Sequence, residues 1–412
     1  MSGRNVGDVE PALPYGGDGL DWALLAALSD ARGVSGDEGR VRDIVAAAVA
    51  PHVDELWTDA IGNLYARKRG DRVAAVATTD LRGVGRPDAG ANEPGSPAAR
   101  SSEPAVPPLM VCAHLDEVGL MVVDIDGDGM ARLAAVGGVL GAAVVGQRVR
   151  IGADGVVGVV GLPPAHATTD AVRARLPALE ELRIDLGVTT RDAALALVQP
   201  GDGAIWDTAT VDLGPTLLGK AMDDRAGCWA LAMLLRSRYP MDIVGVFSVQ
   251  EEAGTRGAGP AAHRLAPSAA FVLECGTTDD TPKDRDDTPV MRVGDGPAIT
   301  VMDSSMVADV RLVRHLVATA EREAIRHQIR APKGGGTDGG KIHLARRGVP
   351  TAVVSAPCRY LHGPQALVSK HDLAGMVALV RAALESWSPD IVAPIPFDRP
   401  GSPHSLNREV AP

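Results

Sequence analysis

Basic residues are outnumbered by acidic ones in this sequence of 412 residues. Lysine and arginine together number 41 against 52 aspartates and glutamates, which gives a formal net charge of −11 at pH 7. We find no stretch in which basic residues are interleaved with aromatic ones, and such a stretch is the usual electrostatic footprint of a nucleic-acid-binding surface. We therefore expect no nucleic-acid partner.

Long apolar runs are missing as well. No stretch reaches the ~18 uninterrupted apolar residues that indicate a membrane-spanning helix. The opening stretch, MSGRNVGDVEPALPYGGDG, lacks the charged region followed by an apolar region that is typical of a secretory signal. These two absences predict a cytoplasmic protein that does not enter a membrane.

Cysteine is rare, with 4 residues that lie far apart and form no C-x-x-C pair. This spacing favours neither a disulfide framework nor a zinc site made of cysteines. We expect the four side chains to be small buried hydrophobes that pack beneath the motifs described below. They are Cys112, Cys228, Cys275 and Cys358.

The remaining composition is that of a folded protein. Hydrophobic residues make up 45% of the chain, which is enough for a sizeable core in roughly two or three domains of ~150 residues. Residues 71–108 are rich in Gly, Pro, Ala and Ser without periodicity, and this composition predicts a disordered insertion. We expect residues 1–18 to be flexible and the Pro-rich tail, residues 389–412, to be extended or disordered.

Elsewhere, apolar runs alternate with helical patterns. Ser35 and Glu38 have the spacing of a capping box and predict a helix over residues 35–53. Further helices are expected over residues 223–238 and 371–387, and short buried strands within residues 108–123, 241–252, 268–276 and 350–360. This alternation predicts an α/β domain, residues 19–121 and 216–388, whose sheet is covered on both faces.

Residues 122–215 have a different pattern. Short runs punctuated by glycine, such as GQRVRIGADGVVGVVGLPP, are typical of antiparallel strands, and only the stretch around RDAALALV is helix-like. We expect a smaller β-rich domain that is inserted into the α/β domain.

Polar residues follow the predicted buried strands at the points where their apolar runs end. Because sites in open α/β sheets form beyond the carboxyl ends of the strands, these side chains are expected to converge. Carboxylates and imidazoles that converge in this way suit Zn²⁺, Mn²⁺ or Co²⁺. They are His114, Asp116, Glu117, Asp223, Asp224, Glu251, Glu252, Glu274 and His362.

Charge balance favours two metal ions. Two divalent ions and a hydroxide would balance the three carboxylates of Asp223, Glu252 and Glu274, with neutral His114 and His362. Paired ions are the arrangement used by hydrolases that activate water, aminopeptidases among them. For Glu251 and Glu252 alone, a solvated turn after a strand would be the simpler interpretation.

Six motifs in this order carry a resemblance to a known family. They are AHLDEVG, GKAMDDRAG, QEEAGTRGA, FVLECGTTDD, GGGTDGG and PCRYLHGP. The series resembles that of the glutamyl aminopeptidase-like metallopeptidases, which include the tetrahedral, dodecameric aminopeptidases of prokaryotes. The resemblance implies a three-layer zinc-aminopeptidase-like sheet with an inserted barrel-like domain that mediates subunit contacts and substrate access.

The resemblance also implies roles for the matching residues. Glu251 would be the general base, and Asp116 would hold the imidazole of His114 in the ligating tautomer. The peptide bond after the bridging aspartate would be cis. One metal ion would be bound by His114 and Glu274, the other by Glu252 and His362, and both by Asp223.

We therefore expect a metal-dependent aminopeptidase that hydrolyses N-terminal residues from peptides with a free N-terminus, as a homo-oligomer and specifically a dodecamer. A two-metal amidase or deacylase acting on a non-peptide amide is the alternative, and a catalytically inactive scaffold is a weaker one. The chain departs from the family pattern at Gly363 and Ala366, where the family has a serine and an acid, which puts the local support of His362 in question. The preferred N-terminal residue cannot be inferred from the motifs.

Overall fold

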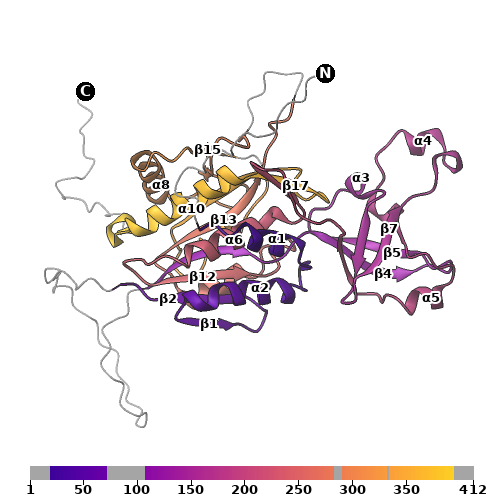
Figure 1. Ribbon diagram of the computed structural model, residues 1–412, viewed down its shortest axis with the longest axis horizontal. Coiled ribbons are helices and arrows are strands. Elements are labelled where there is room, and N and C mark those ends of the chain that lie inside the picture. The colour runs from indigo at the N-terminus through magenta and orange to yellow at the C-terminus, as the bar shows by residue number, and fades with distance from the viewer. Residues whose placement is uncertain (1–18, 72–106, 283–289, 332–333, 394–412) are drawn as a thin grey trace, which may run out of the picture.

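The computed structural model describes residues 19–71, 107–282, 290–331 and 334–393. A large layered domain and a smaller barrel domain lie side by side (Figure 1). The barrel interrupts the chain of the layered domain between two of its strands, β3 (Leu109–His114) and β10 (Val211–Asp212). The insertion of a β-rich domain into an α/β domain, expected from the sequence, is thus confirmed.

The layered domain is built on a sheet of 11 strands within the described residues, in the order β1-β2-β12-β3-β13-β16-β17-β11-β10, with β14 pairing with β16 and β15 with β14. Its four central strands, β12, β3, β13 and β16, are parallel neighbours. Their residues are almost all buried, which explains their continuous apolar runs. The strands are β1 (Glu55–Thr58), β2 (Leu64–Lys68), β3 (Leu109–His114), β10 (Val211–Asp212), β11 (Thr216–Gly219), β12 (Ile243–Ser248), β13 (Ala269–Thr277), β14 (Ala298–Thr300), β15 (Gln328–Arg330), β16 (Thr351–Arg359) and β17 (Ala366–Ser369).

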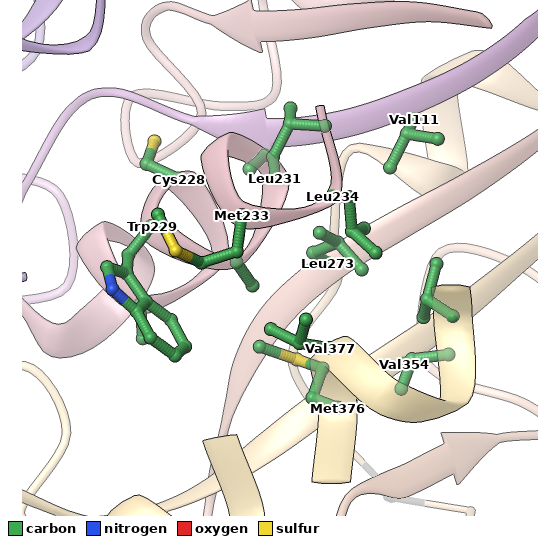
Figure 2. Close-up of a cluster of buried hydrophobic side chains, with 14 of the residues drawn as sticks. Val111, Cys228, Trp229, Leu231, Met233, Leu234, Leu273, Val354, Met376 and Val377 are labelled. Carbon is green, nitrogen blue, oxygen red and sulfur yellow. The ribbon is translucent and has the colours of Figure 1, made fainter. Parts of the chain in front are cut away.

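Helices cover both faces of this sheet. One face packs against α6 and α10, where Leu234 of α6 and Met376 and Val377 of α10 lie around Leu273 of β13 (Figure 2). The other face packs against α7 and α9. The three layers confirm the predicted fold class. The helices are α1 (Trp22–Asp30), α2 (Gly39–Val49), α6 (Met222–Leu234), α7 (Ala258–Leu265), α8 (Val310–Arg322), α9 (Gly339–Ile342) and α10 (Lys370–Glu385), with the 3-10 turn η1 (Ala50–His52) after α2.

The inserted domain is a closed barrel of six antiparallel strands in the order β4-β5-β8-β7-β6-β9. Alternate residues of these strands point inward and form a separate hydrophobic core around Val149, Ile184 and Trp206. The strands are β4 (Gly119–Ile125), β5 (Ala131–Val136), β6 (Arg148–Ile151), β7 (Val156–Gly161), β8 (Arg183–Asp185) and β9 (Gly203–Trp206); the short helices are α3 (Gly141–Val144), η2 (Ala165–Ala167), α4 (Asp170–Arg173), η3 (Leu179–Glu181) and α5 (Arg191–Leu195).

The predicted capping box of the first long helix is wrong. Helix α2 begins at Gly39, and its N-cap residue, Glu38, makes no capping hydrogen bond with its side chain. Ser35 instead donates its hydroxyl hydrogen to Asp116 Oδ2 at 2.6 Å, and Glu38 accepts from the Gly36 amide at 2.7 Å. Ser35 therefore forms its hydrogen bond with a residue that is distant in sequence, and does not cap the helix to which local spacing assigns it.

Several expectations fall on segments that the structure does not describe. Residues 1–18, residues 72–106 of the predicted insertion and residues 394–412 of the tail lie outside the described ranges. The first residues of the tail are not extended, because Pro389–Val392 forms the 3-10 helix η4. The predicted domain boundaries remain predictions. Among the described helices, none is both long and apolar enough to cross a membrane.

Candidate metal centre

The sequence-predicted site residues converge at one end of the central parallel strands. His114 is the last residue of β3, Glu251 and Glu252 follow β12, and Glu274 lies near the end of β13. His362 follows β16. Because parallel strands present their carboxyl ends at the same edge, residues far apart in the sequence meet there.

His114, Asp223 and Glu274 form the first half of a candidate metal centre. Each offers one ligand atom, and the three atoms lie within 4.8 Å of one another. His114 Nε2 is 3.1 Å from Asp223 Oδ1 and 3.4 Å from Glu274 Oε1. An imidazole nitrogen and two carboxylate oxygens are a ligand set for zinc and related divalent metals.

Asp223, Glu252 and His362 form the second half. Their ligand atoms again lie within 4.8 Å of one another. His362 Nε2 is 3.3 Å from Asp223 Oδ2 and 3.3 Å from Glu252 Oε1. Asp223 thus directs one carboxylate oxygen toward each half, which is the geometry that a bridging ligand requires.

The electrostatics of the cluster fit cations between these side chains. Burial, reinforced by the charge of Asp223, raises the pKa of Glu274 to about 8. Burial alone would lower the pKa of His362, but Asp223 and Glu252 raise it to about 11. Oε1 of Glu252 is buried and accepts no aligned hydrogen bond within the described part of the chain. Acids packed this closely repel one another, so divalent ions would stabilise the cluster.

Asp223 reaches the centre because the chain turns at the start of α6. The peptide bond between Asp223 and Asp224 is cis, as the family resemblance implies. Asp224 is fully buried and accepts hydrogen bonds from the backbone amides of His114, at 3.1 Å, and Gly227, at 2.9 Å. A Cβ on Gly227 would lie 2.3 Å from the Asp224 carboxylate, so only glycine fits there. The two adjacent aspartates thus point in different directions, one into the centre and one against its backbone.

Asp116 holds the first half of the centre in place. Its Oδ1 lies 3.3 Å from His114 Nδ1. The same nitrogen lies 3.1 Å from the Asp116 carbonyl oxygen. With Nδ1–H engaged by either oxygen, the Nε2 lone pair faces Asp223 and Glu274. Asp116 therefore lies next to His114, and its role in fixing the tautomer of that imidazole stays a prediction.

The turn after β12 explains how two adjacent glutamates both enter the centre. Gln250 has a left-handed backbone, with φ of 56°. The amides of Gln250, Glu251 and Glu252 donate in turn to Glu38 Oε1 at 3.2 Å, Asp116 Oδ1 at 2.9 Å and Asp116 Oδ2 at 3.0 Å. Consecutive amides that converge on carboxylates in this way form an anion-binding nest. The amides of this turn thus donate to the buried carboxylates of Glu38 and Asp116 and not to solvent.

The two glutamates then have different neighbours. Glu252 lies against His362. Burial raises the pKa of Glu251 to about 10, an effect that His114 opposes and Glu274 reinforces. The solvated-turn interpretation of this pair does not describe the structure.

Sequence reasoning gave no role to a buried ionic network beneath the centre. Lys220 Nζ lies 2.8 Å from both carboxylate oxygens of Glu117, and Arg225 Nη2 lies 3.0 Å from Oε1. All three side chains are buried, and burial lowers the pKa of Lys220 to about 8. The network joins the end of β3 to the start of α6, the two segments that supply His114 and Asp223. Glu117 and Lys220 lie within two of the quoted motifs, close in sequence to His114 and Asp223. This proximity is the feature of the sequence from which a role near the centre could have been predicted.

Asp338 of the motif GGGTDGG was also given no role. It is 1% exposed and accepts from the Ser248 hydroxyl at 2.5 Å, so it points into the domain beneath the end of β12. Gly334, Gly335 and Gly336 are exposed.

The departures from the family pattern lie in the turn that carries His362. Tyr360 and His362 have positive φ angles, of 59° and 63°, and the Gly363 amide donates to the Tyr360 carbonyl at 3.0 Å. Ala366 begins β17 and pairs with Gly219 of β11. A Cβ on Gly138 would lie 2.9 Å from His362 Nδ1. Backbone geometry and close packing by the barrel domain therefore support this imidazole.

Comparison with known proteins gives a consistent picture. The family model described as M42 glutamyl aminopeptidase matches residues 95–379. A putative aminopeptidase of Acetivibrio thermocellus is 33% identical over 364 residues, covering 88% of this chain and 97% of that protein.

Solved structures match over similar lengths. Aminopeptidase APDkam598 from Desulfurococcus kamchatkensis is 30% identical, with a TM-score of 0.78 over 90% of this chain and 98% of its own. The TET1 peptidase of Pyrococcus horikoshii, which can assemble into a tetrahedron or a large octahedral shell, is 26% identical, with a TM-score of 0.73 over 89% and 99%. A dodecamer of PhTET1 matches with a TM-score of 0.71 at 26% identity, over 89% of this chain and 99% of that chain.

Proposed function

The chain belongs to the M42 glutamyl aminopeptidase family of metallo-aminopeptidases, hydrolases of peptide bonds, and we propose that it releases N-terminal residues from peptides by a mechanism that uses two divalent ions and Glu251 as general base. The observation that carries this proposal is the pair of ligand clusters that share Asp223, with Glu251 next to the clustered Glu252 in the turn that Asp116 holds. Neither a single-metal site nor a surface acidic patch accounts for that arrangement.

The proposed ligands form two sets, one for each metal ion. His114 and Glu274 would hold one ion, Glu252 and His362 the other, and Asp223 both, because its two oxygens face opposite halves. Zinc, cobalt and manganese all suit such a set of oxygen and imidazole ligands. When bound, such a pair polarises the scissile carbonyl and lowers the pKa of an attacking water.

Glu251 would carry the proton. As a carboxylate that ligates neither ion, it is free to accept a proton from the attacking water and to return it to the amine that leaves. Asp116 would keep Glu251 in place through the backbone amide of that residue, as well as fixing the tautomer of His114.

A panel of substrates tests the reaction class. Purified enzyme with known metal content would be assayed on aminoacyl anilides, on the same anilides with an acetylated α-amine, and on N-acyl amino acids. We expect cleavage only where the α-amine is free. Cleavage confined to N-acyl amino acids would favour the amidase or deacylase alternative, and no cleavage by metal-replete enzyme would favour the inactive scaffold.

We also propose that the chain assembles into a homo-oligomer, and specifically a dodecamer. Support comes from the TET relatives, whose structures are multi-subunit shells, and from the barrel domain that this chain shares with them. Light scattering in metal-replete buffer tests it, since a dodecamer has twelve times the 42.6 kDa of the chain. A monomer at micromolar concentration would contradict the assembly but not the chemistry.

A further inference from the structure

A cavity of about 630 Å³ adjoins the second half of the metal centre. The imidazole of His362 lies in its wall. The segment 137–140 leads from the centre to it, since a Cβ on Gly137 would lie 3.2 Å from Glu252 Cβ, and Gly138 and Leu140 line the cavity. Thr277, three residues after Glu274 on β13, forms part of the opposite wall. A group held at the centre can therefore extend a side chain into this space.

The lining of this cavity carries no Asp, Glu, Lys or Arg side chain. Its apolar surface comes from Leu140 of the barrel domain, Leu218 of β11 and Leu361 of the turn after β16. The polar groups that it offers are neutral amides and hydroxyls, such as those of Gln147 and Thr277, and the imidazole of His362.

Two ion pairs stand on elements that neighbour the cavity lining in the chain. Arg359, at the end of β16, is paired with Asp280 at 2.7 Å. Lys370, at the start of α10, is paired with Asp212 of β10 at 2.8 Å. Each of these charges is compensated by its own partner, so neither pair supplies a free charge for a ligand in the cavity.

We propose that this cavity receives the N-terminal side chain of the substrate and selects uncharged, apolar residues of the size of leucine, methionine or phenylalanine. This inference rests on the proposed function and specifies its substrate class. The lining offers no cation to an acidic side chain and no anion to a basic one, so neither gains a charge partner there. An apolar side chain gains from leaving water, and the volume lies within the range of small-molecule sites, ~300 to 1,000 Å³.

The name of the family points to a different residue, so the cavity makes a distinguishing prediction. A pocket built for glutamate would place a lysine or arginine where the γ-carboxylate ends. The described lining has neither, and therefore does not match a preference for glutamate.

The first experiment compares leucyl, methionyl, glutamyl and lysyl anilides on the metal-replete oligomer. We expect kcat/KM for the leucyl or methionyl substrate to exceed that for the charged substrates by at least ~10-fold, because only the apolar side chains gain from leaving water. As a readout independent of turnover, free L-leucine should bind more tightly than L-lysine or L-glutamate in calorimetry.

Charge-introducing variants test the location of the pocket. Thr277 is exposed at the end of β13, so Thr277→Lys and Thr277→Asp should both fold. We expect Thr277→Lys to gain activity on the glutamyl substrate and Thr277→Asp on the lysyl substrate, each by at least ~10-fold relative to leucyl. Leu218→Lys and Leu218→Asp probe the facing wall in the same way. Val159→Lys, on the outer side of the barrel strand β7, is the matched control and should leave the preference unchanged.

The outcomes separate this inference from the function on which it rests. A wild-type enzyme that cleaves glutamyl or lysyl anilide as well as leucyl anilide would overturn the apolar pocket and leave the aminopeptidase intact. Variants that keep the wild-type preference and metal content but change the oligomer mass would show that the cavity belongs to a subunit contact, which also overturns it. Failure to cleave any aminoacyl anilide would instead overturn the proposed function.

Discussion

The two halves of the candidate metal centre are built differently. The imidazole of His114 is 2% exposed, and Asp116 and Asp224 hold its ring nitrogen and backbone amide from inside the domain. The imidazole of His362 is 32% exposed and stands on a turn with left-handed backbone at the mouth of a cavity. The imidazole of the first half is therefore held from inside the domain, whereas the imidazole of the second half is partly exposed. We infer that the first half fixes the centre and that the second half meets the substrate.

The largest effect is expected from removing the ligand that both halves share. Asp223→Asn keeps the shape of the side chain but removes its charge. Supporting groups around a metal are worth ~10- to 100-fold in affinity, and a shared ligand is worth at least as much for each ion. Elemental analysis after dialysis should find both ions depleted, with activity near background and an unchanged circular dichroism spectrum. Retention of both ions would refute the bridging role.

The second-largest effect is expected from variants that each remove a ligand from only one half of the centre. His362→Ala should weaken one ion by at least ~10²-fold and leave the other near its wild-type affinity, because the buried half keeps its ligands and supports. His114→Ala should weaken the other ion and also lower the melting temperature, since it leaves buried carboxylates unpaired. Metal titration of both variants, beside stepwise chelation of the wild type, gives the comparison. Equal losses in the two variants would mean that the halves are not distinct.

A smaller effect is expected from removing a hydroxyl that supports the first half only through Asp116. Ser35→Ala removes the hydroxyl that donates to Asp116 while leaving the amides of Glu251 and Glu252 in place. We expect kcat to fall ~10-fold with metal content and KM nearly unchanged, the low end of the range for such supporting groups. Ser35→Thr keeps the hydroxyl and should restore most of the rate. If Thr and Ala behave alike, the hydrogen bond has no positioning role.

The smallest effect is expected in a segment that belongs to neither half. Residues 71–108 join the end of β2 to the amino end of β3, and β3 is 6 residues long, so its carboxyl end lies ~20 Å away. Replacing the segment with a short Gly/Ser turn should leave kcat per active site within a factor of about three, or ~0.7 kcal/mol of barrier. A much larger loss in a folded variant would show that the segment shapes the site.

The clustering of the candidate ligands could be predicted from the sequence because its information is local. His114, Glu252 and Glu274 each follow a run of apolar residues that predicts a buried parallel strand, and the carboxyl ends of such strands meet by topology. The three-layer fold could be predicted from the sequence for the same reason.

The supports of that ligand set could not be predicted, because their partners lie far away in the sequence. Ser35 and Asp116 are 81 residues apart, and Lys220 and Glu117 are 103 residues apart. Local spacing even assigned Ser35 to a helix cap. The backbone of Gln250 is left-handed and turns the two glutamates into the centre. Because this position is not a glycine, the sequence gives no signal of the turn.

The most direct test of the account is the division of labour between Glu251 and Glu252, measured as metal content beside kcat for Glu251→Gln and Glu252→Gln. Glu251→Gln should keep both ions and lose ~10² to 10⁴ in kcat, the usual contribution of a general base. Glu252→Gln should lose one ion and recover part of its activity in excess metal. Equal metal loss in both variants, or an active Glu251→Gln enzyme, would contradict the account.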